Sequence, residues 1–483
     1  MQIVPYRPKY AERILNARSV FVPSRHCFDH VTAHIMKDSN GKRLCTYFCQ
    51  KEWLSHEIPD IEIIQMPKND VLPLDSEYAL DLSIMPNDVQ ASSIKTVMEN
   101  GFKKAFFNIP TGIGKTLLSI YLVSMLKVKA WATCYRTIVL DQWMETLATK
   151  TDIDISKVAI VHSSKILYKM ATGDWDPHKY DIYLSTPMLL TKFAEQYGCD
   201  LLNDAMNTCG IGVKFYDEAH KNVGNITKIN ALTNIDRTYY LSADFGQASP
   251  EKQKLYYKMF SSTPIIRLTE SQIDAIKYTQ GVIIRFDTHP SILEVEGCFT
   301  GYGFNGYRFM DYELEKDQFY EAIYRTLHAI HTWDKELGTQ YRVLLMCNLI
   351  NHVDILKARI ELMMDEICQF DEEKPHVVRF HSQMPEEEKN DAKLNGDIIV
   401  STHQSMGVGV DLKNIRYVIS MCPLNPIEDN QAAGRARALA DGRDCYYFMF
   451  VDDGFEYAQR QLDERISYLY QQKIKKFSSI KYS

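Results

Sequence analysis

The stretch AFFNIPTGIGKTLLSIYLVSMLKV, residues 105–128, constrains the fold more than any other part of the sequence. A short and mostly apolar run of strand length leads into a loop that contains two glycines, and an apolar run of helical length follows the loop. A strand, a glycine loop and a helix in that order are the context of a phosphate-binding loop, in which backbone N–H groups and the positive end of the helix dipole face phosphate oxygens. The stretch therefore predicts an α/β fold with a phosphate site.

The residues of this loop have separate expected tasks. Lys115 would reach the β- and γ-phosphates, and the Thr116 hydroxyl would bind Mg²⁺. The glycines would let the backbone close on the phosphate oxygens. The residues that we expect to hold a nucleotide are Thr111, Gly112, Gly114, Lys115 and Thr116.

The stretch VKFYDEAH, residues 213–220, supplies two carboxylates. Its first four residues are typical of a buried strand, and Asp217 and Glu218 follow them directly. Ligands of open α/β sheets bind at the carboxyl ends of the strands. We therefore expect Asp217 to hold Mg²⁺ and Glu218 to orient or deprotonate an attacking water.

A second set of alternating strands and helices begins near residue 342. The strand-like runs are RVLLMCN (342–348), VVRFHSQ (377–383), DIIVSTHQSMGVGVDL (397–412), which has a polar and glycine-containing exit, and YVISMCPL (417–424). Helical patterns separate them, and this alternation predicts a second parallel sheet.

Lys115 and the sequence DEAH at residues 217–220 resemble motifs I and II of superfamily 2 helicases and translocases. STHQSMGVGVD (401–411) resembles motif V of the same family, and NQAAGRARAL (430–439) resembles the start of motif VI. The resemblance covers roughly residues 80–455. It implies ATP and Mg²⁺ as cofactors.

The resemblance also implies roles for residues of the second half. In this family an arginine of motif VI reaches the γ-phosphate, which implies Arg435. The second arginine of the family motif falls at Ala438, and Arg437 lies one residue earlier, so either Arg437 substitutes for it or Arg435 acts with less help. The remaining implied positions are Thr402 for nucleic-acid contact, and Gly409, Asp411 and Gln431 for nucleotide binding.

Other parts of the first half match the family less closely. Gln90 is the candidate for the glutamine that reads the adenine edge, because an amide both donates and accepts hydrogen bonds. TCYRTIVLDQW (133–143) and LSTPML (184–189) resemble segments that contact the nucleic-acid backbone, and Arg136 and Thr186 are the candidates there. LSAD (241–244) resembles motif III, with an aspartate in place of the usual final threonine.

The fold expected from these motifs is α/β, with two tandem RecA-like parallel-sheet domains and a small N-terminal α/β accessory domain. The expected limits are 1–78 for the accessory, nucleic-acid-docking domain, 79–265 for the first RecA-like domain, 266–310 for a linker, 311–455 for the second RecA-like domain and 456–483 for a basic helical tail.

The N-terminal segment predicts a hairpin and raises a question about metal. Val31–Met36 and Arg43–Phe48 are typical of strands, and Asn40-Gly41 between them is a strong hairpin signal. A zinc site is one hypothesis for the histidines and cysteines nearby, but the segment has no paired C-x-x-C, so core cysteines are the favoured interpretation. These residues are His26, Cys27, His30, His34, Cys45 and Cys49.

Composition indicates a soluble globular protein, with 45% hydrophobic and 24% charged residues. The first residues lack an apolar signal core, and the 11 scattered cysteines suit a reducing compartment, so we expect a cytoplasmic protein without a membrane partner. The net charge of −7 leaves nucleic acid open as a partner, because a basic groove can be local.

Among superfamily 2 enzymes, the size, the N-terminal segment and LSAD look most like the phage UvsW-type, RecG-like DNA helicases. That resemblance implies an ATP-dependent motor on branched or duplex DNA, which acts in recombination, repair or replication, with phage or host replication and recombination proteins as possible partners. An RNA-directed ATPase or transcript-release factor is the first alternative. A non-catalytic junction-binding protein is the second, because Asp244 and Ala438 depart from the family motifs.

Overall fold

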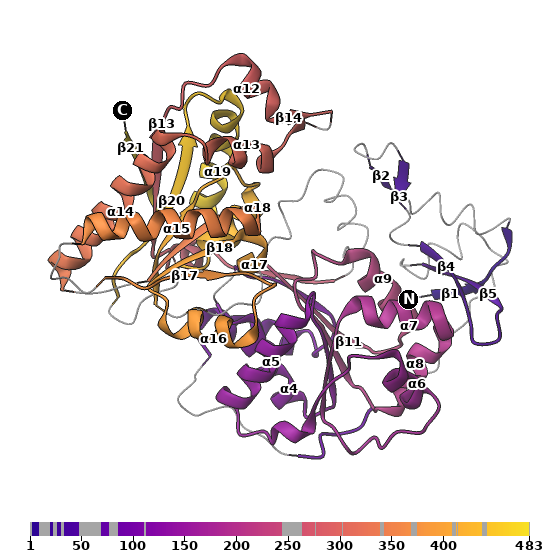
Figure 1. The fold of residues 1–483 in the computed structure, drawn as a ribbon. Coiled ribbons are helices and arrows are strands. Elements are labelled where there is room, and N and C mark those ends of the chain that lie inside the picture. The colour runs from indigo at the N-terminus through magenta and orange to yellow at the C-terminus, as the bar shows by residue number, and fades with distance from the viewer. Residues whose placement is uncertain are drawn as a thin grey trace. The chain divides into compact units, whose positions relative to one another are not determined.

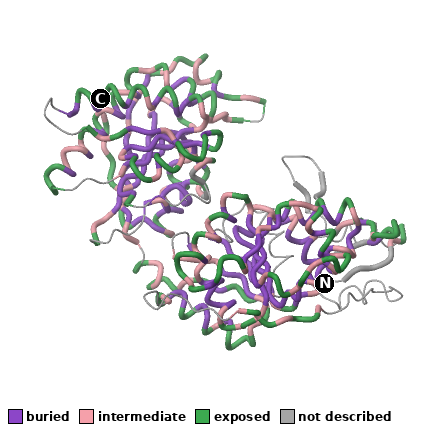
Figure 2. The backbone as a smooth tube through the Cα atoms, turned by 60° about the horizontal axis from the view of Figure 1, so that its bottom comes forward, coloured by how far each residue is buried: buried purple, intermediate pink, exposed green. Residues whose placement is uncertain are grey.

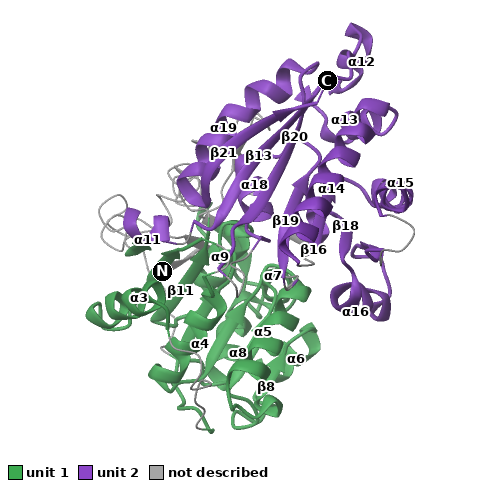
Figure 3. Ribbon diagram, turned by 90° about the vertical axis from the view of Figure 1, so that its left-hand side faces the viewer, with its two compact units in different colours: residues 1–268 green, residues 269–483 purple. Residues whose placement is uncertain are grey.

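The computed structural model describes residues 2–8, 20–22, 27–29, 33–47, 69–76, 86–110, 113–243, 263–275, 277–301, 303–338, 342–368, 374–407, 412, 414–436 and 442–482. The chain forms two compact units, residues 1–268 and 269–483 (Figure 3). In each unit the buried residues gather in the interior (Figure 2). Among the described residues, no helix has the length and apolar character needed to cross a membrane.

The first unit, drawn from indigo to magenta in Figure 1, contains a seven-stranded parallel sheet in the order β12-β6-β11-β10-β7-β9-β8. Its strands are β6 (Ala105–Asn108), β7 (Ala130–Thr133), β8 (Val158–Ile160), β9 (Ile182–Ser185), β10 (Val213–Tyr216), β11 (Arg237–Ser242) and β12 (Ile265–Arg267). Its helices are α3 (Asp88–Glu99), α4 (Lys115–Leu126), α5 (Thr137–Lys150), α6 (Ser164–Ala171), α7 (Pro187–Tyr197), α8 (Cys199–Thr208) and α9 (Val223–Leu232), with a 3₁₀ turn η2 at Ile155–Lys157.

The central strands are apolar on both faces, as a sheet covered by helices on both sides requires. Because successive side chains point to opposite faces, Tyr216 and Tyr240 share one core with helices α6 to α9. Phe215 and Tyr239 lie on the other face, where Phe215 contacts Trp143 of α5 at a ring distance of 6.3 Å. Both cores fix the strands whose ends carry the candidate site.

The described N-terminal residues form small antiparallel sheets. β1 (Gln2–Pro5), β5 (Arg43–Tyr47) and β4 (Ala33–Lys37) pair in that order, and β2 (Val20–Val22) pairs with β3 (Cys27–Asp29). The predicted hairpin is confirmed, with Gly41 at a φ of 78° in its turn. Met36 and Leu44 join the core of the first unit, and the Ser39 N–H donates to Asp200 Oδ1 at 2.7 Å.

The zinc hypothesis lies mostly outside the described residues. Of the six histidines and cysteines proposed for it, only His34 has a described side chain, and its Nε2 lies 3.4 Å from Thr227 Oγ1. Within the described ranges, no group of three or more His, Cys, Asp and Glu side chains is arranged to hold a metal ion.

The second unit contains another seven-stranded parallel sheet, in the order β17-β18-β16-β19-β20-β13-β21. Its strands are β13 (Thr279–Phe286), β16 (Arg342–Cys347), β17 (Val377–Phe380), β18 (Ile398–Thr402), β19 (Ile415–Ser420), β20 (Cys445–Asp452) and β21 (Ile474–Lys481), and a separate hairpin joins β14 (Phe299–Thr300) to β15 (Gly303–Phe304). Its helices are α11 (Glu270–Ala275), α12 (Ile292–Gly297), α13 (Gly306–Glu313), α14 (Asp317–Leu337), α15 (Ile350–Ile367), α16 (Glu386–Asn395), α17 (His403–Gly407), α18 (Pro426–Ala433) and α19 (Glu456–Gln472). The expectation of two tandem parallel-sheet domains is confirmed.

Two segments differ from the sequence prediction. The expected linker 266–310 contains β13, an interior strand of the second sheet, and the expected helical tail 456–483 ends in β21, which pairs with β13. Gly281 makes this pairing possible, because a Cβ there would lie 2.2 Å from the Phe477 ring. Lysines are common on exposed edge strands such as β21. In IKKFSSIK they do not alternate with apolar residues, so the sequence did not predict this strand.

Helix α18 is fixed to the rest of the second unit by a buried ion pair. Arg465 of α19 donates to Asp429 of α18 through Nε and also through Nη2, the latter at 3.0 Å. The Tyr447 hydroxyl of β20 donates to Asp429 Oδ1 at 2.6 Å. Because α18 carries the first residues of the segment that resembles motif VI, including Gln431, this pair positions the start of that segment.

Replacing Arg465 by methionine is expected to destabilise the second unit by about 3–5 kcal/mol, because Asp429 would be left buried without its counter-charge. Hydrogen exchange of peptides from α18 and β20 would show the loss of protection. The control is Arg460→Met on the same helix, whose exposed pair with Glu456 is worth about 0.2–0.5 kcal/mol. Equal protection in the two variants would contradict the assignment.

Candidate functional site

The predicted phosphate-binding loop joins β6 to α4. Gly114 precedes the first helical residue, Lys115, and has a φ of 84° and a ψ of 50°, the left-handed region that favours glycine. The loop thus ends at a helix N-terminus, where unpaired N–H groups attract anions. Thr111 and Gly112 lie outside the described residues.

Gln90 binds the loop itself. Its Nε2 donates to the carbonyl oxygens of Ile113 at 3.0 Å and Gly114 at 3.1 Å, and its Oε1 accepts from the Asn87 N–H at 3.0 Å. The side chain is 3% exposed. In this structure the amide therefore holds the loop to α3, and recognition of adenine by Gln90 stays a prediction.

This contact makes Gly114 sensitive to a methyl group. A Cβ at Gly114 would lie 2.8 Å from Gln90 Nε2, so Gly114→Ala is expected to displace the amide from both carbonyls and to weaken nucleotide binding. Loss of two hydrogen bonds of about 1 kcal/mol each corresponds to a loss of affinity of at least about tenfold. Titration with a fluorescent ATP analogue measures this loss.

Gly173→Ala is the matched control. Gly173 also has a positive φ, 77°, but a Cβ there would meet nothing within 4 Å. Both variants carry the backbone strain of a left-handed alanine, so only the contact with Gln90 separates them. Equal nucleotide affinities in the two variants would show that Gln90 does not support the loop.

The two predicted carboxylates lie beside the loop. Asp217 and Glu218 follow the carboxyl end of β10, and Glu218 Oε1 lies 4.0 Å from Lys115 Nζ. Lys115 Nζ also donates to the Ile109 carbonyl at 3.3 Å. The side chains of Lys115 and Glu218 are each 9% exposed. The structure therefore brings together the two motifs that the sequence separates.

Glu218 has an unusual backbone. Its φ is 47°, a left-handed conformation that is uncommon for a residue with a side chain. Its N–H donates to Asp217 Oδ1 at 2.9 Å, which stabilises the turn. Backbone strain of this kind is concentrated at functional sites, because the surrounding structure must hold it.

Asp217 is a desolvated carboxylate suited to a cation. Trp143 Nε1 donates to its Oδ2 at 3.1 Å. Burial, and then the neighbouring Glu218 carboxylate, raise the pKa of Asp217 to about 6. A nearby cation would stabilise the charged form, and Mg²⁺ prefers oxygen ligands, so the chemistry of Asp217 fits a magnesium ligand.

His220 connects this acid pair to the next strand, a role that we did not predict. Its Nδ1 lies 3.3 Å from Glu218 Oε2 and 2.8 Å from Ser242 Oγ. Ser242 is the last residue of β11 and the second residue of the LSAD segment, whose Asp244 lies outside the described residues. His220 belongs to the sequence DEAH at residues 217–220, from which we predicted roles for Asp217 and Glu218 only.

Arg136 and Thr186 lie at the same edge of the first sheet. They are the N-cap residues of α5 and α7, which follow the neighbouring strands β7 and β9. Arg136 is exposed, with its guanidinium 5.1 Å from the centre of the Tyr135 ring. The Thr186 hydroxyl accepts from the Leu189 N–H at 3.4 Å. Adjacent helix N-termini at one edge suit phosphate contacts.

The described candidates of the second unit lie near the ends of its strands and on α18. The Thr402 hydroxyl donates to Ser405 Oγ at 2.8 Å and accepts from the Ser405 N–H at 3.0 Å. Gln431 is buried on α18, and its side-chain nitrogen has no hydrogen-bond partner in the described part of the chain. Arg435 is partly buried just beyond this helix. Gly409, Asp411 and Arg437 lie outside the described residues.

Comparisons with known families agree with this arrangement. The family model described as type III restriction enzyme, res subunit, matches residues 83–244, and the model described as helicase conserved C-terminal domain matches residues 322–438. No curated protein matches the sequence.

Solved structures share the fold. A point variant of S. cerevisiae Dbp5, in a structure titled as bound to RNA and ADP BeF3, superposes with a TM-score of 0.52 at 14% identity, over 82% of this chain and 90% of that chain. Dbp5 itself, in a structure with a corresponding title, gives a TM-score of 0.51 with the same identity and coverage.

Proposed function

Since the chain is a superfamily 2 helicase ATPase, we propose that it couples ATP hydrolysis to translocation on DNA and remodels branched or duplex DNA by fork regression, branch migration or unwinding. The observation that carries the proposal is the approach of Lys115 to Glu218, beside a buried Asp217, at one end of the first sheet. The UvsW-type resemblance supports DNA as the track. Replication and recombination proteins in a cytoplasmic setting are its proposed partners.

Each candidate residue of the first unit has a separate role in the proposed hydrolysis of ATP. Bound Mg²⁺ would neutralise phosphate charge, with Thr116 and Asp217 as its protein ligands. Lys115 and the loop N–H groups hold the phosphates, with Thr111, Gly112 and Gly114 shaping the loop. Glu218 orients the attacking water and accepts its proton at a carboxylate oxygen, while His220 holds the Glu218 side chain.

We assign the rest of the site to the second unit. Arg435, with or without Arg437, stabilises charge on the γ-phosphate, and Gln431, Gly409 and Asp411 contact the nucleotide. A hinge motion that follows the state of ATP would then change the grip on a strand. Arg136, Thr186 and Thr402 are the proposed contacts to the phosphate backbone.

The rate of ATP hydrolysis by wild type and by Lys115→Ala tests this function. It is measured without nucleic acid and, in parallel, with single-stranded DNA, duplex DNA, forked or four-way DNA, or RNA. Hydrolysis stimulated most by forked or four-way DNA, and absent in Lys115→Ala, is the expected result. Equal rates in the two proteins would refute the assignment of the loop.

An RNA-directed ATPase, including a transcript-release factor, is the second candidate, because the Dbp5 structures with the same fold are titled as bound to RNA. An RNA enzyme can use the 2′-hydroxyl, whereas a DNA enzyme does not need it. Stimulation by RNA alone in the same assay would therefore replace the DNA assignment.

A further inference from the structure

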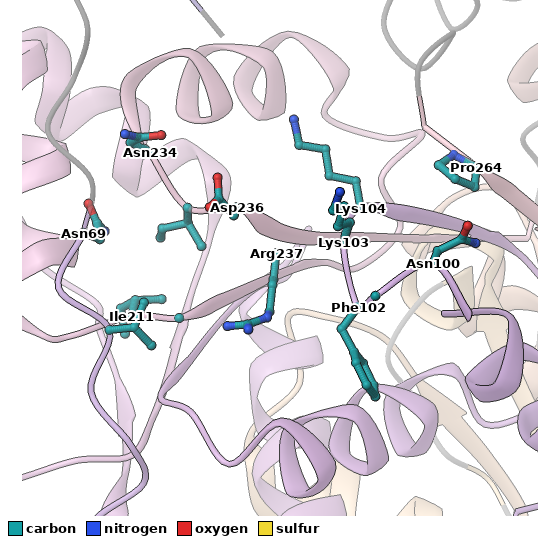
Figure 4. A pocket seen from close by; sticks show the side chains of 14 residues that line it. Asn69, Asn100, Phe102, Lys103, Lys104, Ile211, Asn234, Asp236, Arg237 and Pro264 are labelled. Atoms are coloured by element: carbon teal, nitrogen blue, oxygen red, sulfur yellow. The ribbon is translucent and has the colours of Figure 1, made fainter. Parts of the chain in front are cut away.

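A cavity of about 740 Å³ lies at the amino ends of the strands of the first sheet (Figure 4). Its lining includes the residues just before β6 and β10 and the first residue of β11. Lys115 lies beyond the carboxyl end of β6, Asp217 and Glu218 lie beyond that of β10, and Ser242 is the last residue of β11. The cavity, which we call the amino-edge cavity, is thus separated from the phosphate-binding loop by the length of the strands, roughly 13–20 Å.

Positive charge predominates in the lining. The lining contains three basic residues, Lys103, Lys104 and Arg237, and one acidic residue, Asp236. In Figure 4 the Lys104 and Arg237 side chains extend to different sides of the strand ends, so positive charge lines the cavity on two sides. Burial lowers the pKa of Lys104, and Asp236 opposes that effect. A second negative charge in the cavity would favour the charged form of this ammonium group and so offset the effect of its burial.

Asn69 adds an unsatisfied polar group to this lining. Both its side-chain oxygen and its side-chain nitrogen are buried, and neither has a hydrogen-bond partner among the residues that the structure describes. Buried amides of folded proteins are almost always hydrogen-bonded, so such a group indicates a missing partner. The cavity has the size of a small-molecule site, which is about 300–1,000 Å³.

We propose that the amino-edge cavity binds a small phosphate-bearing anion of nucleotide size, with Lys103, Lys104 and Arg237 on its phosphates and Asn69 as a neutral hydrogen-bonding partner. The consequence for the motor follows from the sheet. β6, β11 and β10 are neighbours, and they lead to the phosphate-binding loop, Ser242 and Asp217 respectively. A ligand that holds their amino ends together would act through the strands on the loop, on Ser242 and on Asp217, as an effector of hydrolysis.

Calorimetric titration with inorganic tripolyphosphate, without Mg²⁺, tests the site in the full-length Lys115→Ala protein, which lacks the lysine of the phosphate-binding loop. One site is expected to remain. Adding Lys103→Ala and Arg237→Ala is expected to weaken it by at least about tenfold, because charge-assisted hydrogen bonds are lost. The matched control adds Lys165→Ala and Lys169→Ala, two exposed lysines of α6, and should bind tripolyphosphate as Lys115→Ala does. Circular dichroism checks that each variant is folded.

Three results would overturn the proposal. They are loss of all tripolyphosphate binding in Lys115→Ala, equal affinity of the cavity variant and its control, and binding of a single-stranded oligonucleotide but not of tripolyphosphate.

A parallel titration with a non-hydrolysable ATP analogue separates the two sources of the phosphate, a nucleotide and a free polyphosphate. Tighter binding than that of tripolyphosphate identifies a nucleotide, and equal binding identifies the phosphates alone. No hydrolysis is measured, so failure of the proposed motor function would not affect this result.

Discussion

Glu218→Gln is expected to bind ATP with an affinity close to that of wild type and to hydrolyse it about 10²–10⁴-fold more slowly, as the loss of a general base requires. Glutamine has the size of glutamate and can keep the contact with His220, but it does not accept the proton of the attacking water. The position of Glu218, 4.0 Å from Lys115 Nζ and in a left-handed backbone conformation, directs its carboxylate to the phosphate site. Single-turnover hydrolysis with saturating DNA measures the chemical step.

Two controls keep this result specific. Glu145→Gln changes an exposed glutamate of α5 in the same unit and should hydrolyse ATP at the wild-type rate. Binding of a fluorescent ATP analogue shows that the Glu218 variant still fills its site. Hydrolysis that is indistinguishable between wild type and Glu218→Gln would contradict the catalytic assignment and favour a non-catalytic junction-binding protein.

The sequence was informative where one segment determines its own structure. The strand and helix around the glycine loop, and the four strand-like runs of the second half, correspond to β6, α4, β16, β17, β18 and β19. Each is a mostly apolar run, so the local pattern was sufficient to predict it. β13 and β21 were missed because their paired residues, such as Thr279 and Ile474, lie 195 or more positions apart, and their place in the sheet depends on the fit of Phe477 over Gly281.

The candidate site shows the same limit. Lys115 and Asp217-Glu218 could be predicted because their residue types, and their places after apparent strands, are those that phosphate and metal binding require. The hydrogen bonds of Gln90 to the loop could not, because an amide that reads a base and an amide that holds a backbone look alike in sequence. The link from Glu218 through His220 to Ser242 depends on the pairing of β10 with β11, which no local pattern specifies.

Arg435→Ala is expected to lower the rate of DNA-stimulated hydrolysis by about 10³–10⁵, the contribution of an arginine that stabilises transition-state charge on a transferred phosphoryl group. ATP binding should fall much less, since that charge develops during the reaction. The buried pair of Asp429 with Arg465 holds α18 independently of Arg435, so the variant is expected to stay folded. The kcat and KM for ATP, measured with forked DNA, separate the two effects. An unchanged kcat would remove Arg435 from the reaction.

Variants of Arg437 test whether this residue replaces the second arginine of the family motif, which is Ala438 in this chain. If Arg437 performs the task of the family's second arginine, Arg437→Ala lowers kcat, and adding Ala438→Arg, which restores the family spacing, recovers it. If Arg435 acts alone, Arg437→Ala leaves kcat unchanged and Ala438→Arg adds nothing. Because wild type and the double variant carry the same net charge and differ only in which of two neighbouring positions holds the guanidinium, recovery of the wild-type kcat would show that position 438, as in the family motif, can supply this charge.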